Sequence, residues 1–272
     1  MQMGTNIAEI LNFYKEAGVD EVINDDPTDH FALSAAPPKQ KVATPYSPAP
    51  SPASAAPSSP QPTSAPSINL AAEIEKAEAL AQSANNLEQL KEKLDQFTGS
   101  SLKSMAISTV FARGNPAANL MIIDRTPGAE EDRQGQPFAA QKGGLLEKML
   151  KAIGLEMDMV YLAAALPWRP PGGQAPSRED KSLCLPFLKR HIELVDPQVL
   201  LLCGEAAAIL LEKDKVGVNK LRGKWEIIKV GNKEIPTLSI FHPAFLMDHP
   251  ASKKLAWKDL LALKAHLNNI PH

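Results

Sequence analysis

Four short runs of almost uninterrupted apolar residues recur along the chain from residue 118 onward. The runs are Ala118–Asp124, Val160–Leu166, Gln198–Cys203 and Ile235–Phe241. Strands of a parallel sheet are covered on both faces, so they read as continuous apolar runs rather than as an alternation. The pattern therefore predicts four strands of a mainly parallel sheet.

Segments with helical periodicity separate or follow these runs. They are Gly143–Ile153, Ser177–Leu194, Glu205–Leu211 and Ser252–Leu267, and a further helix over Leu70–Gln96 is expected before the first strand. Ser177, with Asp180 three positions later, has the pattern of a helix N-cap. Alternating strands and helices predict a three-layer α/β/α sandwich, whose ligands lie beyond the carboxyl ends of the strands.

Proline is concentrated in one segment of the chain. Between Pro37 and Ser67, 23 of the 31 residues are Pro, Ser or Ala. Such a composition cannot bury enough apolar surface to offset the entropy of ordering, so residues 34–67 are predicted to be an extended, disordered linker. This linker divides the chain into a head, residues 1–33, and a body, residues 68–272, that is long enough for one well-cored domain.

The head is strongly acidic and has a helical apolar pattern. Its seven Asp and Glu residues face a single lysine, Lys15, and Ile7, Ile10, Leu11 and Tyr14 recur at helical spacing. A short amphipathic helix on a flexible tether is typical of a peptide that docks into a groove of a protein partner. The alternatives are a helix that folds back onto the body and one that frays.

Charge and composition exclude several classes of protein. The whole chain has a formal charge of −2, so any contact with DNA must come from local patches of the body. Two cysteines exclude a disulfide scaffold and a metal site of four cysteines within one chain. No apolar run is long enough to cross a membrane, the N-terminus lacks an export signal, and a cytoplasmic protein is expected.

Three of the predicted strand ends lead into segments that look like motifs. Asp124–Ala140 reads DRTPGAEEDRQGQPFAA, Trp168–Asp180 reads WRPPGGQAPSRED and His242–Met247 reads HPAFLM. With FARGNPAANLMII before them and KLRGKW between the last two, these segments resemble the uracil-DNA glycosylase superfamily, specifically its bacterial family 4 type. The corresponding family patterns are GE(A/G)PGxxEDxxGxPF(V)G, RPPxNRxP and HP(A/S)YLL. The resemblance covers about Phe97 to the C-terminus.

The resemblance implies a pocket for a uracil that has left the DNA stack. Phe138 matches the ring that stacks on the base, His242 matches the contact to the uracil oxygen that gains charge, and Pro127 and Gly128 belong to the substrate loop. The DNA partner would be contacted by these predicted residues: Leu246 and Met247 as an apolar wedge, and Arg169 and Arg222, with Lys224, Lys253 and Lys254, at phosphates. The plain alternatives are a turn or core histidine, a core phenylalanine and scattered surface charge.

Two replacements remove the polar groups on which excision depends. The acidic residue of the family pattern is Arg125 here, and the uracil-reading amide is the methyl group of Ala164. Asp124, one residue earlier, is the remaining candidate to hold a water, but strand alternation predicts that its side chain points to the other face unless the turn shifts register. Uracil excision by the usual route is therefore expected to be lost.

The iron–sulfur ligands of the family 4 type are also replaced. The four cluster positions align with Ser100, Lys103, Trp168 and Cys184, of which only Cys184 offers a thiolate. Cys203 lies within a predicted strand and is interpreted as a small core residue. No cofactor and no metal are therefore expected.

Three hypotheses follow for function. The first is an impaired or non-catalytic member that still binds DNA or a partner in base-excision repair. The second is an active uracil-DNA glycosylase that hydrolyses the N-glycosidic bond with altered residues, its water held by Asp124 or backbone groups together with His242. The third is a domain repurposed with no DNA contact.

Overall fold

The computed structural model describes residues 70–213 and 215–269, all within the compact unit Ser64–His272. The acidic head (residues 1–33) and the Pro-rich linker (34–67) predicted from the sequence lie outside the described residues. Among the described residues, no helix is both long and apolar enough to cross a membrane.

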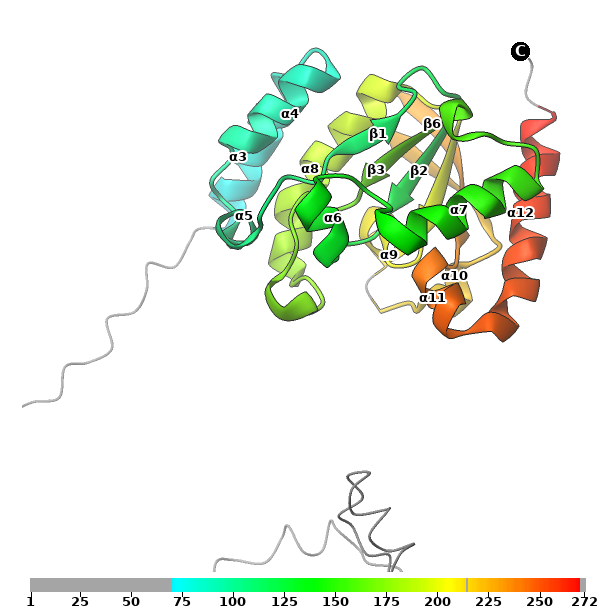
Figure 1. Cartoon of the computed structure of the whole chain (residues 1–272). Coiled ribbons are helices and arrows are strands. Elements are labelled where there is room, and N and C mark those ends of the chain that lie inside the picture. The colour runs from blue at the N-terminus through cyan, green and yellow to red at the C-terminus, as the bar shows by residue number, and fades with distance from the viewer. Residues whose placement is uncertain (1–69, 214, 270–272) are drawn as a thin grey trace, which may run out of the picture. The chain divides into compact units, whose positions relative to one another are not determined.

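A six-stranded sheet forms the centre of the domain, in the order β1-β3-β2-β4-β6-β5 (Figure 1). The strands are β1 (Ala112–Gly114), β2 (Leu120–Asp124), β3 (Val160–Ala164), β4 (Val199–Cys203), β5 (Trp225–Val230) and β6 (Lys233–Ile240). The four central strands β3, β2, β4 and β6 are parallel, and β1 and β5 pair antiparallel at the two edges.

The four predicted strands are thus confirmed as β2, β3, β4 and β6, but a sheet of only four strands was wrong. Both missed strands lie at edges. Edge strand β1 has three residues, too few for a periodic signal. Strand β5 exposes alternate side chains, so it lacks the continuous apolar run that marks a strand buried on both faces.

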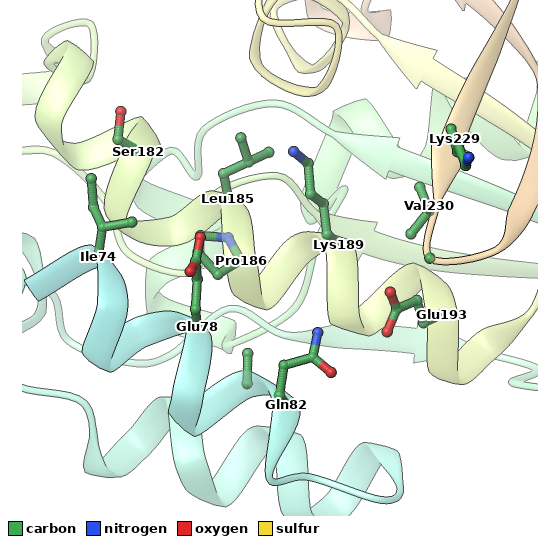
Figure 2. Close-up of a pocket in the computed structure, with 12 residues that line it drawn as sticks. Ile74, Glu78, Gln82, Ser182, Leu185, Pro186, Lys189, Glu193, Lys229 and Val230 are labelled. Carbon is green, nitrogen blue, oxygen red and sulfur yellow. The ribbon is translucent and has the colours of Figure 1, made fainter. Parts of the chain in front are cut away.

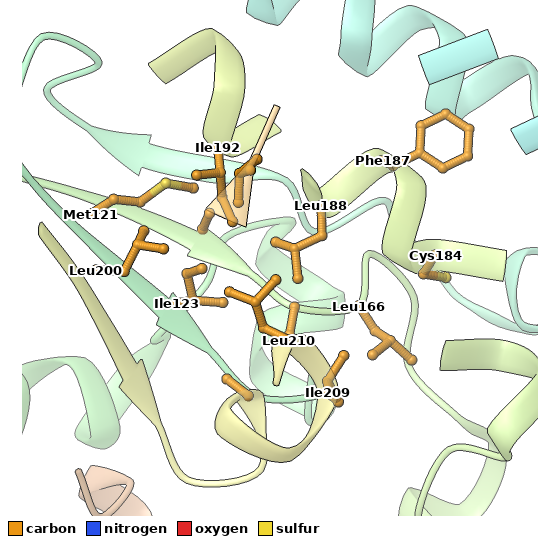
Figure 3. Packing of buried hydrophobic residues seen from close by; sticks show 14 of the residues in the cluster. Met121, Ile123, Leu166, Cys184, Phe187, Leu188, Ile192, Leu200, Ile209 and Leu210 are labelled. Carbon is orange, nitrogen blue, oxygen red and sulfur yellow. The ribbon is translucent and has the colours of Figure 1, made fainter. Parts of the chain in front are cut away.

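Helices cover both faces of the sheet, as an α/β/α sandwich requires. On one face, α8 (Arg178–Val195) packs on the sheet, and α3 (Leu70–Gln82) and α4 (Leu87–Gln96) pack on α8. Figure 3 shows this core, where Leu188 and Ile192 of α8 meet Met121 and Ile123 of β2. On the other face lie α7 (Ala140–Ala152) and α12 (Lys253–Leu267).

Short helices complete the domain. They are α5 (Ser101–Met105), α6 (Ala129–Gln134), α9 (Ala206–Leu210), α10 (Val218–Leu221), α11 (Pro243–Asp248) and the 3-10 turns Met157–Met159, Pro171–Gly173 and Pro250–Ser252. The predicted N-cap of α8 is confirmed, because Ser177 Oγ accepts the Asp180 N–H at 3.0 Å. The single helix predicted over Leu70–Gln96 was wrong: the chain breaks after Gln82, and Asn86 caps α4 by accepting the Gln89 N–H at 2.8 Å.

Candidate functional site

Three predicted site residues from distant parts of the chain meet beyond the strand ends. Asp124 ends β2, Phe138 lies before α7, and His242 follows β6. The Asp124 Oδ1 and His242 Nε2 atoms are 2.7 Å apart, and the Phe138 and His242 rings are stacked with centroids 5.7 Å apart at 8°. All three side chains are at most 3% exposed. The fold therefore assembles a buried acid–imidazole–aromatic cluster.

The protonation of His242 follows from its hydrogen bonds. His242 caps α11, and the Ala244 N–H donates to Nδ1 at 3.0 Å. An accepting Nδ1 carries no proton, so Nε2 holds it and donates to Asp124. The backbone of Gly204, which follows β4 and has φ +63°, packs closely against His242. A Cβ added to this glycine would lie only 2.8 Å from the His242 Cβ. The imidazole is held in one tautomer and one orientation.

Phe138 is fixed by its backbone rather than by its ring alone. Its N–H donates to Asp124 Oδ2 at 2.7 Å, and its carbonyl accepts from Arg113 Nη2 at 2.9 Å. Its φ is +51°, and Ala140, where the family pattern has Gly, has φ +54°. Such left-handed conformations strain a residue that has a Cβ, and strain of this kind gathers at functional sites. Arg113 lies in the FARGNPAANLMII segment of the family resemblance, but no role was predicted for it, because its strand β1 was missed.

Asp124 faces this cluster, which corrects the predicted orientation. Neighbours Leu120 and Ile122 pack with Phe138 in one core, whereas Met121 and Ile123 belong to the core on the opposite face. Alternation puts Asp124 on the Phe138 side, and the pairing of β2 with β3 stays regular up to Asp124 opposite Ala164. No shift of register is needed. The prediction failed because it assumed that the pocket faces the side of position 125.

Ala164 ends β3 beside Asp124 and is buried. Paired residues of neighbouring strands point to the same face, so a methyl group stands next to the carboxylate where the family has an amide. Pro127 is buried and Gly128 caps α6. Glu131 ties this loop together by accepting the Gly128 N–H at 3.0 Å and the Ala139 N–H at 2.9 Å. Glu131 therefore connects the start of α6 to the residue that follows Phe138.

Arg125 and His242 lie at the same cavity. It has a volume of about 210 Å³, and its other walls are Gly204, Glu205, Val218, Asn219, Phe241 and Phe245. The Arg125 Nε atom is buried and has no hydrogen-bond partner within the part of the chain that the structure describes. The sequence did not single out Gly204 and Glu205, because β4 leads straight into a helix without a motif.

The predicted DNA contacts differ in how far they reach solvent. Leu246 is 1% exposed and packs with Phe241 and Ala256, whereas Met247 is 39% exposed. A side chain that inserts into a duplex must reach it, so of the two only Met247 is placed for that role. The Arg222 guanidinium pairs with buried Asp259, Nε to Oδ2 at 2.9 Å.

The remaining cations that were predicted to contact DNA also differ in their exposure to solvent. Lys224, Lys253 and Lys254 are exposed. The Arg169 Nε is buried and, among the described residues, has no hydrogen-bond partner. Phosphate contacts therefore fit the three lysines better than Arg222, whose charge is already paired.

The four cluster positions do not offer a set of iron ligands. Trp168 is buried, stacks on Phe97 with centroids 6.5 Å apart, and donates its indole N–H to Thr109 Oγ1 at 3.2 Å. Lys103 donates to the Phe97 carbonyl at 3.0 Å, and Ser100 caps α5. Burial raises the pKa of the Cys184 thiol. One protonated thiol and an aromatic cluster do not fit a four-iron cluster, which needs four thiolates.

A groove of about 370 Å³ lies apart from the strand ends, between α3, α8 and the turn after β5. Figure 2 shows Glu78 and Lys189 among its lining side chains, and neither Asp124 nor His242 takes part in it. Its charges are of both signs, and no residue predicted to be functional lines it. We therefore place the candidate site at the strand ends.

The protein is of the α/β/α class, with a buried acid–imidazole pair at the carboxyl ends of its parallel strands. Comparison with known proteins identifies its family. The model of the uracil DNA glycosylase superfamily matches residues 111–261. The chain belongs to this superfamily, because the match spans more than half of it.

Three relatives show how the similarity is distributed. The type-4 uracil-DNA glycosylase of Sulfurisphaera tokodaii is 30% identical over 186 residues, covering 66% of this chain and 84% of that protein. That of Thermotoga maritima is 28% identical over 184 residues, covering 66% and 94%. A DNA polymerase of Bacillus phage SP01 is 25% identical over 167 residues, covering 61% of this chain but 18% of the polymerase.

Proposed function

We propose that this protein binds DNA in a base-excision repair context and does not excise uracil. The observation that carries the proposal is the state of Asp124. Its two carboxylate oxygens accept from His242 Nε2, the Arg125 N–H and the Phe138 N–H, all within 2.8 Å, and the residue is 2% exposed. Three of the roughly four acceptor positions of this carboxylate are taken and the residue is buried, so Asp124 is not arranged to hold an attacking water.

The two replaced residues support the same proposal. Ala164 presents a methyl group where a site that reads uracil needs a hydrogen-bonding amide. Losing such a pairing reduces discrimination between bases by roughly 10⁴–10⁵. Arg125 places a positive charge where an acid that orients water is expected, and it lines the cavity beside His242. Catalysis therefore lacks its base, while the fold and the loop remain in place.

Support for DNA as the partner comes from the relatives and from exposed lysines. The relatives are named as uracil-DNA glycosylases and as a DNA polymerase. Lys253 and Lys254 begin α12, a few residues after Met247, and are exposed. Lysines at such a position suit phosphate contacts, which set the register of a strand.

The test measures release and binding on one substrate. A single-stranded oligonucleotide with one uracil is incubated with the protein, and free uracil and fluorescence anisotropy are recorded at several salt concentrations. We expect binding that weakens as salt rises and no uracil release above buffer. Release that His242→Ala abolishes would establish the second hypothesis, an active glycosylase. Absence of salt-dependent binding would support a domain repurposed without DNA contact.

A matched pair of variants locates the DNA surface. Lys253→Glu and Lys264→Glu make the same charge change on exposed residues near opposite ends of α12. We expect Lys253→Glu to weaken binding. The slope of the logarithm of the binding constant against the logarithm of salt concentration should also become shallower, by the amount that about one phosphate contact contributes. Lys264→Glu should leave both unchanged. Equal effects of the two variants would mean that binding follows net charge only.

Two further proposals concern cofactor and partner. Because the aligned positions supply one buried thiol, we propose that the protein carries no iron–sulfur cluster, and purified protein should lack the visible absorbance of one.

For the acidic head, residues 1–33, we propose a docking role toward a basic groove of a protein partner, based on its charge and apolar spacing alone. Deleting it should leave the affinity for DNA unchanged.

A further inference from the structure

Three hydrogen-bond donors converge on the Asp124 carboxylate. Oδ1 accepts from the Arg125 N–H at 2.8 Å and from His242 Nε2 at 2.7 Å, and Oδ2 accepts from the Phe138 N–H at 2.7 Å. Two of these donors are backbone groups and the third is a fixed imidazole tautomer. Ligand sites orient a bound molecule with a small number of accurately positioned polar groups, backbone N–H donors among them.

Contacts outside Asp124 hold two of these donors in place. Arg113 fixes Phe138 through its carbonyl, and the Ala244 N–H fixes His242 through Nδ1. Asp124 therefore fills an arrangement that other residues support. The buried Phe138 ring stacks with the His242 ring beside these donors. Donors beside an aromatic face are what a pyrimidine base with carbonyl oxygens needs.

We propose that Asp124 is a built-in occupant of this site: its carboxylate takes the donors that a pyrimidine base would use and so keeps such a base out. The proposal rests on the proposed function, because a wild-type protein that excised uracil would have to admit the base. Residue 124 then decides whether the site is closed or open. Glycine, the residue of the family pattern at this position, would open it.

The experiment compares Asp124→Gly with the wild type and with Asp124→Asn. Asparagine keeps the volume filled, whereas glycine removes the side chain and leaves three donors without a partner. The readout is the melting temperature of the full chain with free uracil, with unsubstituted pyrimidine, which has the same ring without carbonyl oxygens, and with formate.

We expect uracil to raise the melting temperature of Asp124→Gly, by about 5–10 °C at one hundred times its dissociation constant. Pyrimidine should have no effect on this variant, and uracil should have none on the wild type or on Asp124→Asn. A folded Asp124→Gly that does not respond to uracil would overturn the proposal. So would stabilisation by formate alone, since the site would then accept a carboxylate but not a base.

If Asp124→Gly does not fold, refolding in the presence of each ligand gives the same decision, because recovery of the cooperative transition with uracil supports the proposal and recovery with formate alone overturns it. If no ligand restores folding, Asp124→Ala is measured in its place, with the same two outcomes. Uracil release by the wild type from the oligonucleotide would overturn the proposed function and this inference together. An inert wild type with an unresponsive variant overturns only the inference.

Discussion

Two buried regions of this domain depart from the family pattern, and they are built in opposite ways. At the strand ends, Asp124 is joined to His242, Arg125 and Phe138 by directed hydrogen bonds. On the other face of the sheet, two of the four positions of the cluster ligands are filled by packing: Trp168 stacks on Phe97, which contacts Phe187 at 5.3 Å between centroids, and Cys184 is buried in the same core.

The difference shows what each kind of replacement requires. A buried polar group must find partners of the right chemistry, because an unsatisfied donor or acceptor costs about 1–3 kcal/mol. A buried ring needs chiefly volume and contact. We therefore expect the Asp124 region to respond to changes of single atoms, and the Trp168 region to respond to changes of size.

The largest effect is expected for Trp168→Ala. Removing this ring leaves a cavity against Phe97 and should lower the free energy of unfolding by about 3–5 kcal/mol. Chemical denaturation measures it. Trp168→Phe, which keeps a ring but loses the hydrogen bond to Thr109, should have a much smaller effect. Equal losses in the two variants would show that the indole N–H, not packing, stabilises this region.

A smaller loss, about 1–3 kcal/mol, is expected for Asp124→Asn. The amide keeps the shape of the carboxylate but turns an NH₂ group toward at least one of the three donors. The matched control is Glu130→Gln on α6, whose partner Arg133 is exposed, and where a change within about 0.5 kcal/mol is expected. If Asp124→Asn left the free energy of unfolding unchanged, the Asp124 region would not depend on single atoms in the way that the comparison of the two regions predicts.

A buried histidine, His191, beside the Tyr161 hydroxyl on the face that carries the Trp168 region gives this face a dependence on pH. His191 lies 2.9 Å from the Tyr161 hydroxyl and stacks on Phe111, and burial lowers its pKa to about 3. The unfolded chain binds a proton at this histidine below about pH 6.5, whereas the folded chain binds it only near pH 3. The free energy of unfolding should therefore decrease as the pH is lowered from about 6.5 toward 3, by up to about 1.4 kcal/mol per pH unit.

Denaturation at pH 5, 6 and 7 measures this slope. In His191→Phe the slope should flatten, while His249→Gln, a change at an exposed histidine, should retain it. A wild-type slope that His191→Phe leaves unchanged would assign the pH dependence to other groups.

The smallest expected effect is a gain. Ala140 has φ +54° where the family pattern has glycine, so Ala140→Gly should relieve strain and raise stability by about 1 kcal/mol. Ala152→Gly, at the last residue of the same helix, is the control, and there glycine should destabilise. A loss at position 140 would show that the loop of Phe138 carries no strain.

Local patterns in the sequence determined the central sheet and the helices on it. The four parallel strands have continuous apolar runs, and Ser177 with Asp180 places the start of α8, because these signals depend only on neighbouring residues. Sequence motifs likewise brought Asp124, Phe138 and His242 into one hypothesis. The family itself follows from motifs that keep their order along the chain.

Tertiary structure alone decided what those residues contact. Which face of β2 carries the cluster depends on where distant loops cross the sheet, so the direction of Asp124 did not follow from strand alternation by itself. The pairing of Arg222 with Asp259, 37 positions along the chain, the burial of Leu246 beside exposed Met247, and the clamp of Arg113 on Phe138 have the same origin. A hydrogen bond needs two groups at one point in space, and that point is set by the packing of the whole domain.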